Sequence, residues 1–461
     1  MSSGGLTIDT SERDDARATA LTQAEGALHR FPPGFVWGVA TSSFQIEGGR
    51  ASRDESIWDR FCTIPGAILD GSNGDVACGH HEHAATDVNL MGQLGLSAYR
   101  FSISWPRVIP GGRGDPAPAG LDFYDRLVDQ LLAAGIDPYI TLYHWDLPQA
   151  LEESGGWPER STAYDFAEYA DVVAGALGDR VKHWATLNEP YCSSHFGYAT
   201  GYMAPGRASV DEGFAAAHHL LLGHGLAVER LRARVPDAEV GIVINFGPQH
   251  PASADPADAA AAAAKDALFN RWFVEPIAGL GYPIDDTGEV RWSGAEIHDG
   301  DLDIIAAPID VLGVNYYTRS LVDAGEAPVT PPNQVTGIGW EIYPAGLAET
   351  MRWLHGRFDF PRYLITENGA AMDDRPDVNG YVDDQDRIDY LRRHLNVVHD
   401  LVEEGVPLEG YFAWSLMDNF EWAYGYTQRF GLIRVDYETL ERIPKASARW
   451  YGEVARSNSV P

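Results

Sequence analysis

Two glutamates, each beside an asparagine, are the residues of this chain best suited to catalysis. Glu189 lies in Thr186-Leu-Asn-Glu-Pro190, and Glu367 lies in Ile365-Thr-Glu-Asn-Gly369. Taken alone, a glutamate after an apolar run is as often a solvated loop residue as a functional one. A pair of carboxylates in one site can protonate a leaving oxygen with one group, while the other attacks a carbon or activates water. This is the chemistry of glycoside hydrolysis.

Side chains suited to sugar binding follow several other apolar runs. Amides, carboxylates and imidazole form directed hydrogen bonds with hydroxyl groups, and Trp and Tyr offer flat apolar faces to a pyranose ring. The segments are Gln45-Ile-Glu-Gly48, Arg100-Phe-Ser-Ile-Ser-Trp105, His144-Trp-Asp-Leu-Pro148, Asn315-Tyr-Tyr317 and Trp414-Ser-Leu-Met-Asp-Asn-Phe-Glu-Trp422. Their composition favours a carbohydrate ligand.

Eight short runs rich in β-branched and aromatic residues must position these side chains. Runs of this kind that alternate with helical stretches predict βαβ units, and eight units predict an α/β fold made of a single closed (β/α)8 TIM barrel. The runs lie near Val36–Ile46, Ala98–Trp105, Pro138–Trp145, Val181–Asn188, Val240–Phe246, Val311–Tyr317, Tyr363–Thr366 and Gly410–Leu416. Glu189 and Glu367 follow the fourth and seventh runs, so both are expected at the mouth formed by the carboxyl ends of the strands.

The rest of the chain agrees with one barrel. No change in composition marks a second domain, so residues 31–457 are expected to form one catalytic barrel, with an indistinct stretch at Asp285–Pro332. Residues 1–30 lack the apolar stretch of a secretory signal and are expected to be a flexible leader. Apolar residues at helical spacing predict helices between the runs. The clearest of these predicted helices lie at 121–132, Ala163–Leu177, Phe214–Leu231, Ile388–Val402 and Ser447–Val454.

Charge and cysteine content exclude several classes of protein. The 461 residues include 67 acidic and 34 basic side chains, which gives a formal net charge of -33. Such a charge repels nucleic acid and anionic membranes, and no apolar run reaches the length of a membrane span. The three cysteines form no CxxC pair. We therefore expect a cytoplasmic protein with no nucleic acid or membrane partner, and a homo-oligomer is possible.

From Phe31 to Tyr451 the chain resembles the family-1 glycoside hydrolases, the β-glucosidase family. The resemblance rests on the segments quoted above, which occur in the order typical of the family. It implies that Glu189 is the acid/base and Glu367 the nucleophile of a retaining mechanism, with carboxyl groups about 5–5.5 Å apart. It also implies that the enzyme needs no metal or other cofactor.

The resemblance assigns roles to the surrounding residues. It implies that Asn315 and Tyr317 support the nucleophile together with Arg100, and that Trp340 forms a wall on the aglycone side, with Phe430 at the same mouth. An arginine and a tyrosine hydroxyl near Glu367 would keep that carboxylate ionised. The residues expected to hold the glycone are Gln45, His144, Trp145, Asn188, Trp414, Glu421 and Trp422.

Two positions narrow the expected substrate. The resemblance implies that family members acting on 6-phosphorylated sugars have a serine at the position of Glu421 and a nearby lysine that binds the phosphate. This chain has Glu421 and no lysine between Lys265 and Lys445, which favours unphosphorylated substrates. Members specialised for thioglucosides have glutamine in place of Glu189. We therefore expect a retaining β-glycosidase that hydrolyses terminal non-reducing β-D-glucosyl residues from O-glycosides or β-linked oligosaccharides. β-Fucosides or β-galactosides are expected as further substrates. The expected reaction is a double displacement through a covalent glycosyl-enzyme.

Other functions remain as alternatives. The same intermediate could pass to an alcohol acceptor, which would make the enzyme a transglycosylase, and a barrel of this kind could also bind sugars without catalysis. A metal-dependent hydrolase is disfavoured because the first run lacks the His-x-His expected at its end. Gly79-His-His-Glu-His83 could bind a metal, but a loop leading into a helix with one packed imidazole is favoured. His195 and Phe196 could line the aglycone side.

Overall fold

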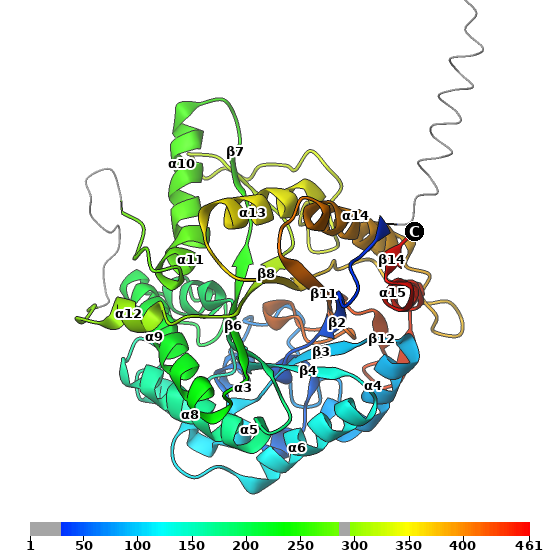
Figure 1. Cartoon of the computed structure of the whole chain (residues 1–461), viewed down its shortest axis with the longest axis horizontal. Helices are drawn as coiled ribbons and strands as arrows, with labels where there is room; N and C mark the ends of the chain where they lie inside the picture. Colours follow the sequence, from blue (N-terminus) through cyan, green and yellow to red (C-terminus); the bar gives the residue numbers. More distant parts are fainter. Residues whose placement is uncertain (1–28, 285–295) are drawn as a thin grey trace, which may run out of the picture.

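The computed structural model describes residues 29–284 and 296–461, and its centre is a closed barrel of parallel strands ringed by helices (Figure 1). Each predicted run coincides at least in part with one strand, so the predicted (β/α)8 barrel is confirmed. The barrel strands are β2 (Val36–Ala40), β3 (Ala98–Ser102), β4 (Asp137–Tyr143), β5 (His183–Asn188), β6 (Glu239–Phe246), β8 (Val311–Tyr316), β10 (Tyr363–Asn368) and β11 (Leu408–Trp414).

Helices with one apolar face cover the outside of the barrel. In α6 (Pro118–Ala133), Phe123, Leu127 and Leu131 recur at helical spacing and are buried, and the turn that follows uses Gly135 at a φ of 72°. Helices α8 (Ser161–Leu177) and α9 (Val210–Arg234) pack on each other. The other outer helices are α4 (His80–Leu94), α10 (Pro256–Asp266), α11 (Trp272–Ile277), α12 (Asp301–Ile305), α13 (Pro344–Arg357), α14 (Gln385–Glu403) and α15 (Ala446–Ser457).

Shorter elements lie in the connections between the barrel strands and the outer helices. They are the helices α2 (Ser43–Ile46), α3 (Ile57–Cys62), α5 (Trp105–Val108) and α7 (Gln149–Glu153), the 3₁₀ turns η1 (Arg50–Ser52), η2 (Pro110–Gly112) and η5 (Trp422–Tyr424), and the π-helical stretches η3 (Cys192–Ala199) and η4 (Ala267–Arg271). Two small sheets pair β7 (Gln249–Pro251) with β9 (Ser320–Val322) and β12 (Ile433–Val435) with β13 (Arg442–Pro444).

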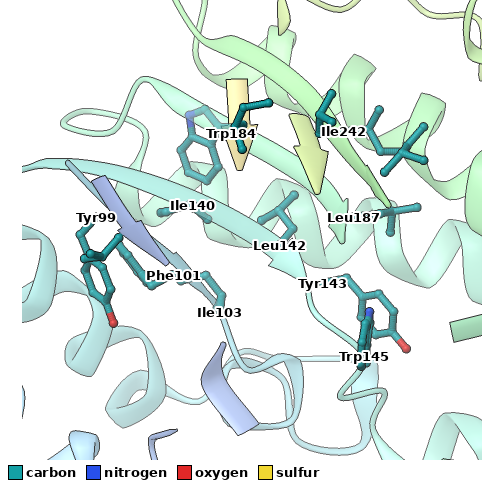
Figure 2. Packing of buried hydrophobic residues seen from close by; sticks show 14 of the residues in the cluster. Tyr99, Phe101, Ile103, Ile140, Leu142, Tyr143, Trp145, Trp184, Leu187 and Ile242 are labelled. Atoms are coloured by element: carbon teal, nitrogen blue, oxygen red, sulfur yellow. The ribbon is translucent and has the colours of Figure 1, made fainter. Parts of the chain in front are cut away.

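The alternation of side chains along β3 separates packing from chemistry. Tyr99 and Phe101 lie on one face of the strand among buried apolar residues, and Figure 2 shows them beside Ile140 of the neighbouring strand β4. Arg100 lies between them in the sequence and therefore on the opposite face, inside the barrel. Its Nε donates to Thr141 Oγ1 of β4 at 3.0 Å. A buried cation is thus held at the centre of the barrel.

The two ends of the described chain meet. β1 (His29–Arg30) pairs antiparallel with β14 (Ser459–Val460). The predicted leader, residues 1–30, falls outside the described residues except for this pair, and part of the indistinct stretch Asp285–Pro332 also falls outside them. No helix within residues 29–284 and 296–461 is long and apolar enough to cross a membrane.

Candidate active site

Both predicted catalytic glutamates line one cavity of about 350 Å³ at the carboxyl ends of the strands. This volume is in the range that holds a small-molecule ligand. Ten of the predicted site residues share the cavity wall: His144, Trp145, Glu189, Tyr317, Trp340, Glu367, Trp414, Glu421, Trp422 and Phe430. The barrel therefore brings together side chains from five of its eight strand ends or the loops that follow them.

Glu367 on β10 has a donor on each carboxylate oxygen. Arg100 Nη1 donates to its Oε1 at 2.7 Å, and Tyr317 Oη donates to its Oε2 at 2.6 Å. A guanidinium group and a hydroxyl donor both stabilise negative charge and fix the plane of the carboxylate. This arrangement suits an ionised group that must attack along a defined direction.

Glu189, directly after β5, is held differently. Asn315 Nδ2 donates to its Oε1 at 2.7 Å, and the thiol of Cys192 donates to its Oε2 at 3.2 Å. Burial raises the pKa of Glu189, and the negative charge of Glu367 raises it further. A neutral carboxyl group is therefore favoured here, in the same cavity as a carboxylate that is paired with a cation.

The position of Asn315 differs from the role expected of it. It was expected to support Glu367 together with Tyr317, but its amide nitrogen donates to Glu189 and, at 3.1 Å, to Asn188 Oδ1. Its amide oxygen accepts from Thr366 Oγ1 at 2.7 Å. Asn315 is paired with Glu367 in the ladder between β8 and β10, yet its side-chain amide reaches Asn188 and Glu189 at the end of β5.

A buried network connects the two glutamates to the glycone side. Arg100 Nη2 donates to Asn188 Oδ1 at 2.6 Å, and Asn188 Nδ2 lies 3.1 Å from His144 Nε2. Burial and the charge of Arg100 keep the pKa of His144 well below its usual value. A neutral imidazole that accepts at Nε2 carries its proton on Nδ1, which has no protein partner in the described part of the chain.

Three non-glycine residues at this site have a left-handed backbone conformation. Trp145, Glu189 and Trp422 have φ values of 76°, 46° and 48°. Such conformations cost about 1–3 kcal/mol each and persist only where the surroundings impose them. Trp145 and Trp422 pack with ring centroids 4.5 Å apart, and His144 stacks on Trp414 at 5.8 Å. Tight aromatic packing thus holds the wall of the cavity in strained geometry.

Gln45 and Glu421 lie on the same side of the site. Gln45 is buried and does not line the cavity, because its Nε2 donates to Asn419 Oδ1 at 2.9 Å and to the Phe420 carbonyl at 2.8 Å. It therefore supports the segment that carries Glu421. Burial, and then the charges of Glu367 and Glu189, raise the pKa of Glu421 to about 8.

The two residues suggested for the aglycone side, His195 and Phe196, differ in position. Phe196 lines the cavity, whereas His195 is buried and its ring centroid lies 4.7 Å from that of Tyr191, on which it stacks. His80 begins α4 and hydrogen-bonds Asp87 at 2.8 Å, in agreement with the interpretation of a packed imidazole.

The structure also places in the cavity wall residues that the sequence interpretation missed. They are Cys192, Tyr202, Met203, Asn245, Phe246, Gly247, Gln249, Phe269, Thr318, Ser320, Ile338 and Tyr424.

Comparison with known proteins identifies the family. Residues 27–460 match the family described as Glycosyl hydrolase family 1. The chain belongs to glycosyl hydrolase family 1. It is 45% identical over 447 residues to a beta-glucosidase of an Agrobacterium species, covering 94% of this chain and 97% of that one. It is also 45% identical over 463 residues to a bifunctional beta-D-glucosidase/beta-D-fucosidase of Bifidobacterium breve, covering 93% and 99%.

Solved structures agree with this family 1 assignment. The family 1 β-glucosidase from Thermotoga maritima is 43% identical and superimposes with a TM-score of 0.91, covering 95% of this chain and 100% of that chain. The same enzyme in complex with glucoimidazole gives a TM-score of 0.89 at 43% identity, over 93% and 99% of the two chains. The predicted family, barrel fold and glycoside hydrolase function are therefore confirmed, and this family 1 enzyme retains the anomeric configuration.

Proposed function

We propose that this enzyme hydrolyses terminal non-reducing β-D-glucosyl residues, and also β-D-fucosides or β-D-galactosides, with Glu367 as nucleophile and Glu189 as acid/base. The observation that carries the assignment is the contrast between the two carboxyl groups of one cavity. Glu367 is bound by Arg100 and Tyr317, whereas burial and a neighbouring negative charge raise the pKa of Glu189. Two carboxyl groups in such different environments can take different roles, one as an ionised nucleophile and the other as a protonated acid.

The proposed reaction has two steps. In the first, a carboxylate oxygen of Glu367 forms a bond to the anomeric carbon, the glycosidic bond breaks, and Glu189 gives its proton to the leaving oxygen. In the second, Glu189 removes a proton from water, whose oxygen attacks the same carbon and releases Glu367. Esterification of Glu367 removes the negative charge that raises the pKa of Glu189, so Glu189 is a better base at that stage.

The proposed glycone site lies between polar groups and aromatic faces. Glu421 and His144 offer a carboxyl group and an imidazole N–H to sugar hydroxyls, while Trp414 and Trp422 offer flat apolar surfaces in the same cavity. The names of the relatives, a beta-glucosidase and a beta-D-glucosidase/beta-D-fucosidase, support glucosides and fucosides as substrates. These sugars differ in few hydroxyl groups, so one set of partners can accept both.

A panel of aryl β-glycosides tests the proposal, with chelator present throughout. We expect the 4-nitrophenyl β-glucoside or β-fucoside to be hydrolysed best, and the 6-phosphoglucoside to have a kcat/KM at least about 100-fold lower. The cavity is lined by Glu421 and, among the described residues, by no lysine or arginine. A phosphate group on the sugar would therefore lack a positively charged partner. Activity confined to the phosphorylated substrate would contradict the assignment.

The thiol of Cys192 gives a prediction about pH dependence. Its hydrogen bond to Glu189 lowers the pKa of that carboxyl group relative to the same site without a donor. We expect Cys192→Ala to move the alkaline limb of the kcat/KM profile upward by about half a pH unit, because Glu189 then stays protonated to higher pH. Cys192→Ser, with a stronger donor, should move the limb downward. The half-buried thiol of Cys62 provides the control Cys62→Ala, and an unmoved limb in both Cys192 variants would refute the role.

A cytoplasmic location and a contribution to the breakdown of cellulose-derived or other polysaccharide fragments belong to the same proposal. Cys62, Cys78 and Cys192 are all free thiols, which is typical of a reducing compartment. The acidic net charge of -33 argues against nucleic acid or anionic membranes as partners. Glycosides and oligosaccharides are the proposed ligands.

A further inference from the structure

Two histidines and an aspartate meet at the end of the barrel opposite the mouth. His29 lies on β1, which leads into the amino end of β2, and His399 and Asp400 lie on α14, which leads into the amino end of β11. α14 contacts β1 and its partner strand β14, and Figure 1 shows α14 beside β14. None of the three residues lines the active-site cavity, so the proposed reaction gives them no role.

The two imidazoles present the same ring atom to each other. His29 Nδ1 and His399 Nδ1 are 3.2 Å apart, and the ring planes are nearly perpendicular, at 86°. Two nitrogens bound to one tetrahedral zinc ion at about 2.0–2.1 Å are separated by about 3.3–3.4 Å. A zinc ion can therefore bind both Nδ1 atoms with little change in their separation, and each imidazole then carries its proton on Nε2.

A carboxylate extends the pair to three ligands. Asp400 Oδ1 lies 3.8 Å from His399 Nδ1, and the three ligand atoms all lie within 4.8 Å of one another. The Asp400 side chain is 64% exposed, so a rotation of its carboxylate can bring an oxygen to zinc-binding distance. Two imidazoles and a carboxylate, with water in the fourth position, form a tetrahedral set of the kind that binds zinc.

Both histidines are held in place by contacts with the rest of the fold. The backbone of His29 pairs with Val460 of β14. The ring of His399 packs edge-on against Phe31, with centroids 5.5 Å apart, and only 16% of its side chain is exposed. Ligands that are already ordered lose little conformational freedom on binding. Asp400 lies in the last turn of α14, where the helix dipole favours a cation, and the net charge of -33 acts in the same direction.

We propose that His29, His399 and Asp400 bind a zinc ion that fastens β1 to α14. The two histidines are 370 positions apart, so the ion joins the beginning of the described chain to one of its last helices. The unfolded chain does not bring these ligands together, so binding stabilises the folded state. The histidine-rich segment Gly79–His83 is a different part of the chain, on and before α4. The ion has a structural role and takes no part in hydrolysis.

Zinc binding to the full chain, first stripped with chelator and dialysed, tests this site. Calorimetric titration of the wild type should show one bound ion, and Tm should rise by about 2–4 °C at a zinc concentration about 100 times the Kd. His29→Gln and His399→Gln should each lose the ion and the rise in Tm. Asp400→Asn should weaken zinc binding at least about tenfold. Each variant is compared with itself with and without zinc, so a lower starting stability does not affect the result.

The double variant His81→Gln/His83→Gln is the matched control, because it removes two histidines of α4 that are not part of the cluster. It should bind one ion as the wild type does. Cobalt provides a second measurement, since Co²⁺ in a tetrahedral site absorbs visible light far more strongly than aqueous Co²⁺; this absorption should be absent from His399→Gln. A wild type that binds no zinc, or equal zinc binding by the wild type and by both single histidine variants, would overturn the inference. Either result leaves the proposed function standing, because hydrolysis does not involve this ion.

Discussion

Replacing Glu189 with alanine is expected to slow the hydrolysis of cellobiose and alkyl glucosides by about 10²- to 10⁴-fold, the range typical of general acid catalysis. Glycosides of strongly acidic phenols, such as 2,4-dinitrophenol, should lose far less in the first step because their leaving group needs no proton. The second step then limits turnover, since Glu189 is also the base for water. Steady-state rates on both substrate classes measure this difference.

Azide provides the decisive control for Glu189→Ala. The alanine leaves room for a small anion that needs no general base, so azide should restore turnover of the dinitrophenyl substrate and yield a β-glucosyl azide. Glu189→Gln keeps the volume of the side chain and an oxygen that can accept from Asn315, as Glu189 does at 2.7 Å, but it has no acidic proton. It should be slow on cellobiose as well. If Glu189→Ala slows both substrate classes equally, Glu189 is not the acid.

The sequence predicted the barrel well because its signal is repeated and local. A parallel strand buried on both faces needs apolar side chains at nearly every position, and the run around Val240–Phe246 matches β6 (Glu239–Phe246) within one residue. Polar residues at the end of such a run are conspicuous for the same reason. Glu189, after β5, and Glu367, near the end of β10, were found in this way.

Hydrogen bonds between strands were less predictable. The family resemblance identified Asn315 as part of the site, but not that its amide donates to Glu189 rather than to Glu367. That contact depends on the register between β8 and β10 and on the side-chain torsions of a buried network, neither of which leaves a pattern in the sequence. The left-handed backbone of Trp145, Glu189 and Trp422 is likewise imposed by tertiary packing, against the intrinsic preference of those residues.

The part of the cavity wall that is formed by β6 and by the connections after β5 and β6 shows both kinds of omission. Asn245 is a polar residue one position from the end of β6, so the rule that found Glu189 could have found it. Phe269 lies in η4 and Tyr202 lies in a loop far from any strand end. Their place in the cavity follows from how long connections fold over the mouth, and residue spacing carries no information about this.

Replacing Glu367 with glycine should abolish hydrolysis, with a loss of roughly 10⁵- to 10⁶-fold, because the covalent intermediate can no longer form. The same change should leave Glu189 able to act as a base. With an α-glucosyl fluoride, whose configuration resembles that of the glycosyl-enzyme, the variant should transfer glucose to a second sugar and build a β-glycoside that it cannot cleave. Product formation is measured by chromatography and by fluoride release.

The stereochemistry of azide products separates the two glutamates. Glu367→Gly opens the face of the sugar opposite the leaving group, so azide that enters there should convert a β-glucoside with an acidic leaving group into an α-glucosyl azide. Glu189→Ala should give the β-azide, because azide then attacks the glycosyl-enzyme formed on Glu367. The double variant Glu189→Ala/Glu367→Gly has no base and should not use the fluoride donor. Wild-type hydrolysis by Glu367→Gly, or the same azide anomer from both single variants, would remove Glu367 from the proposed reaction.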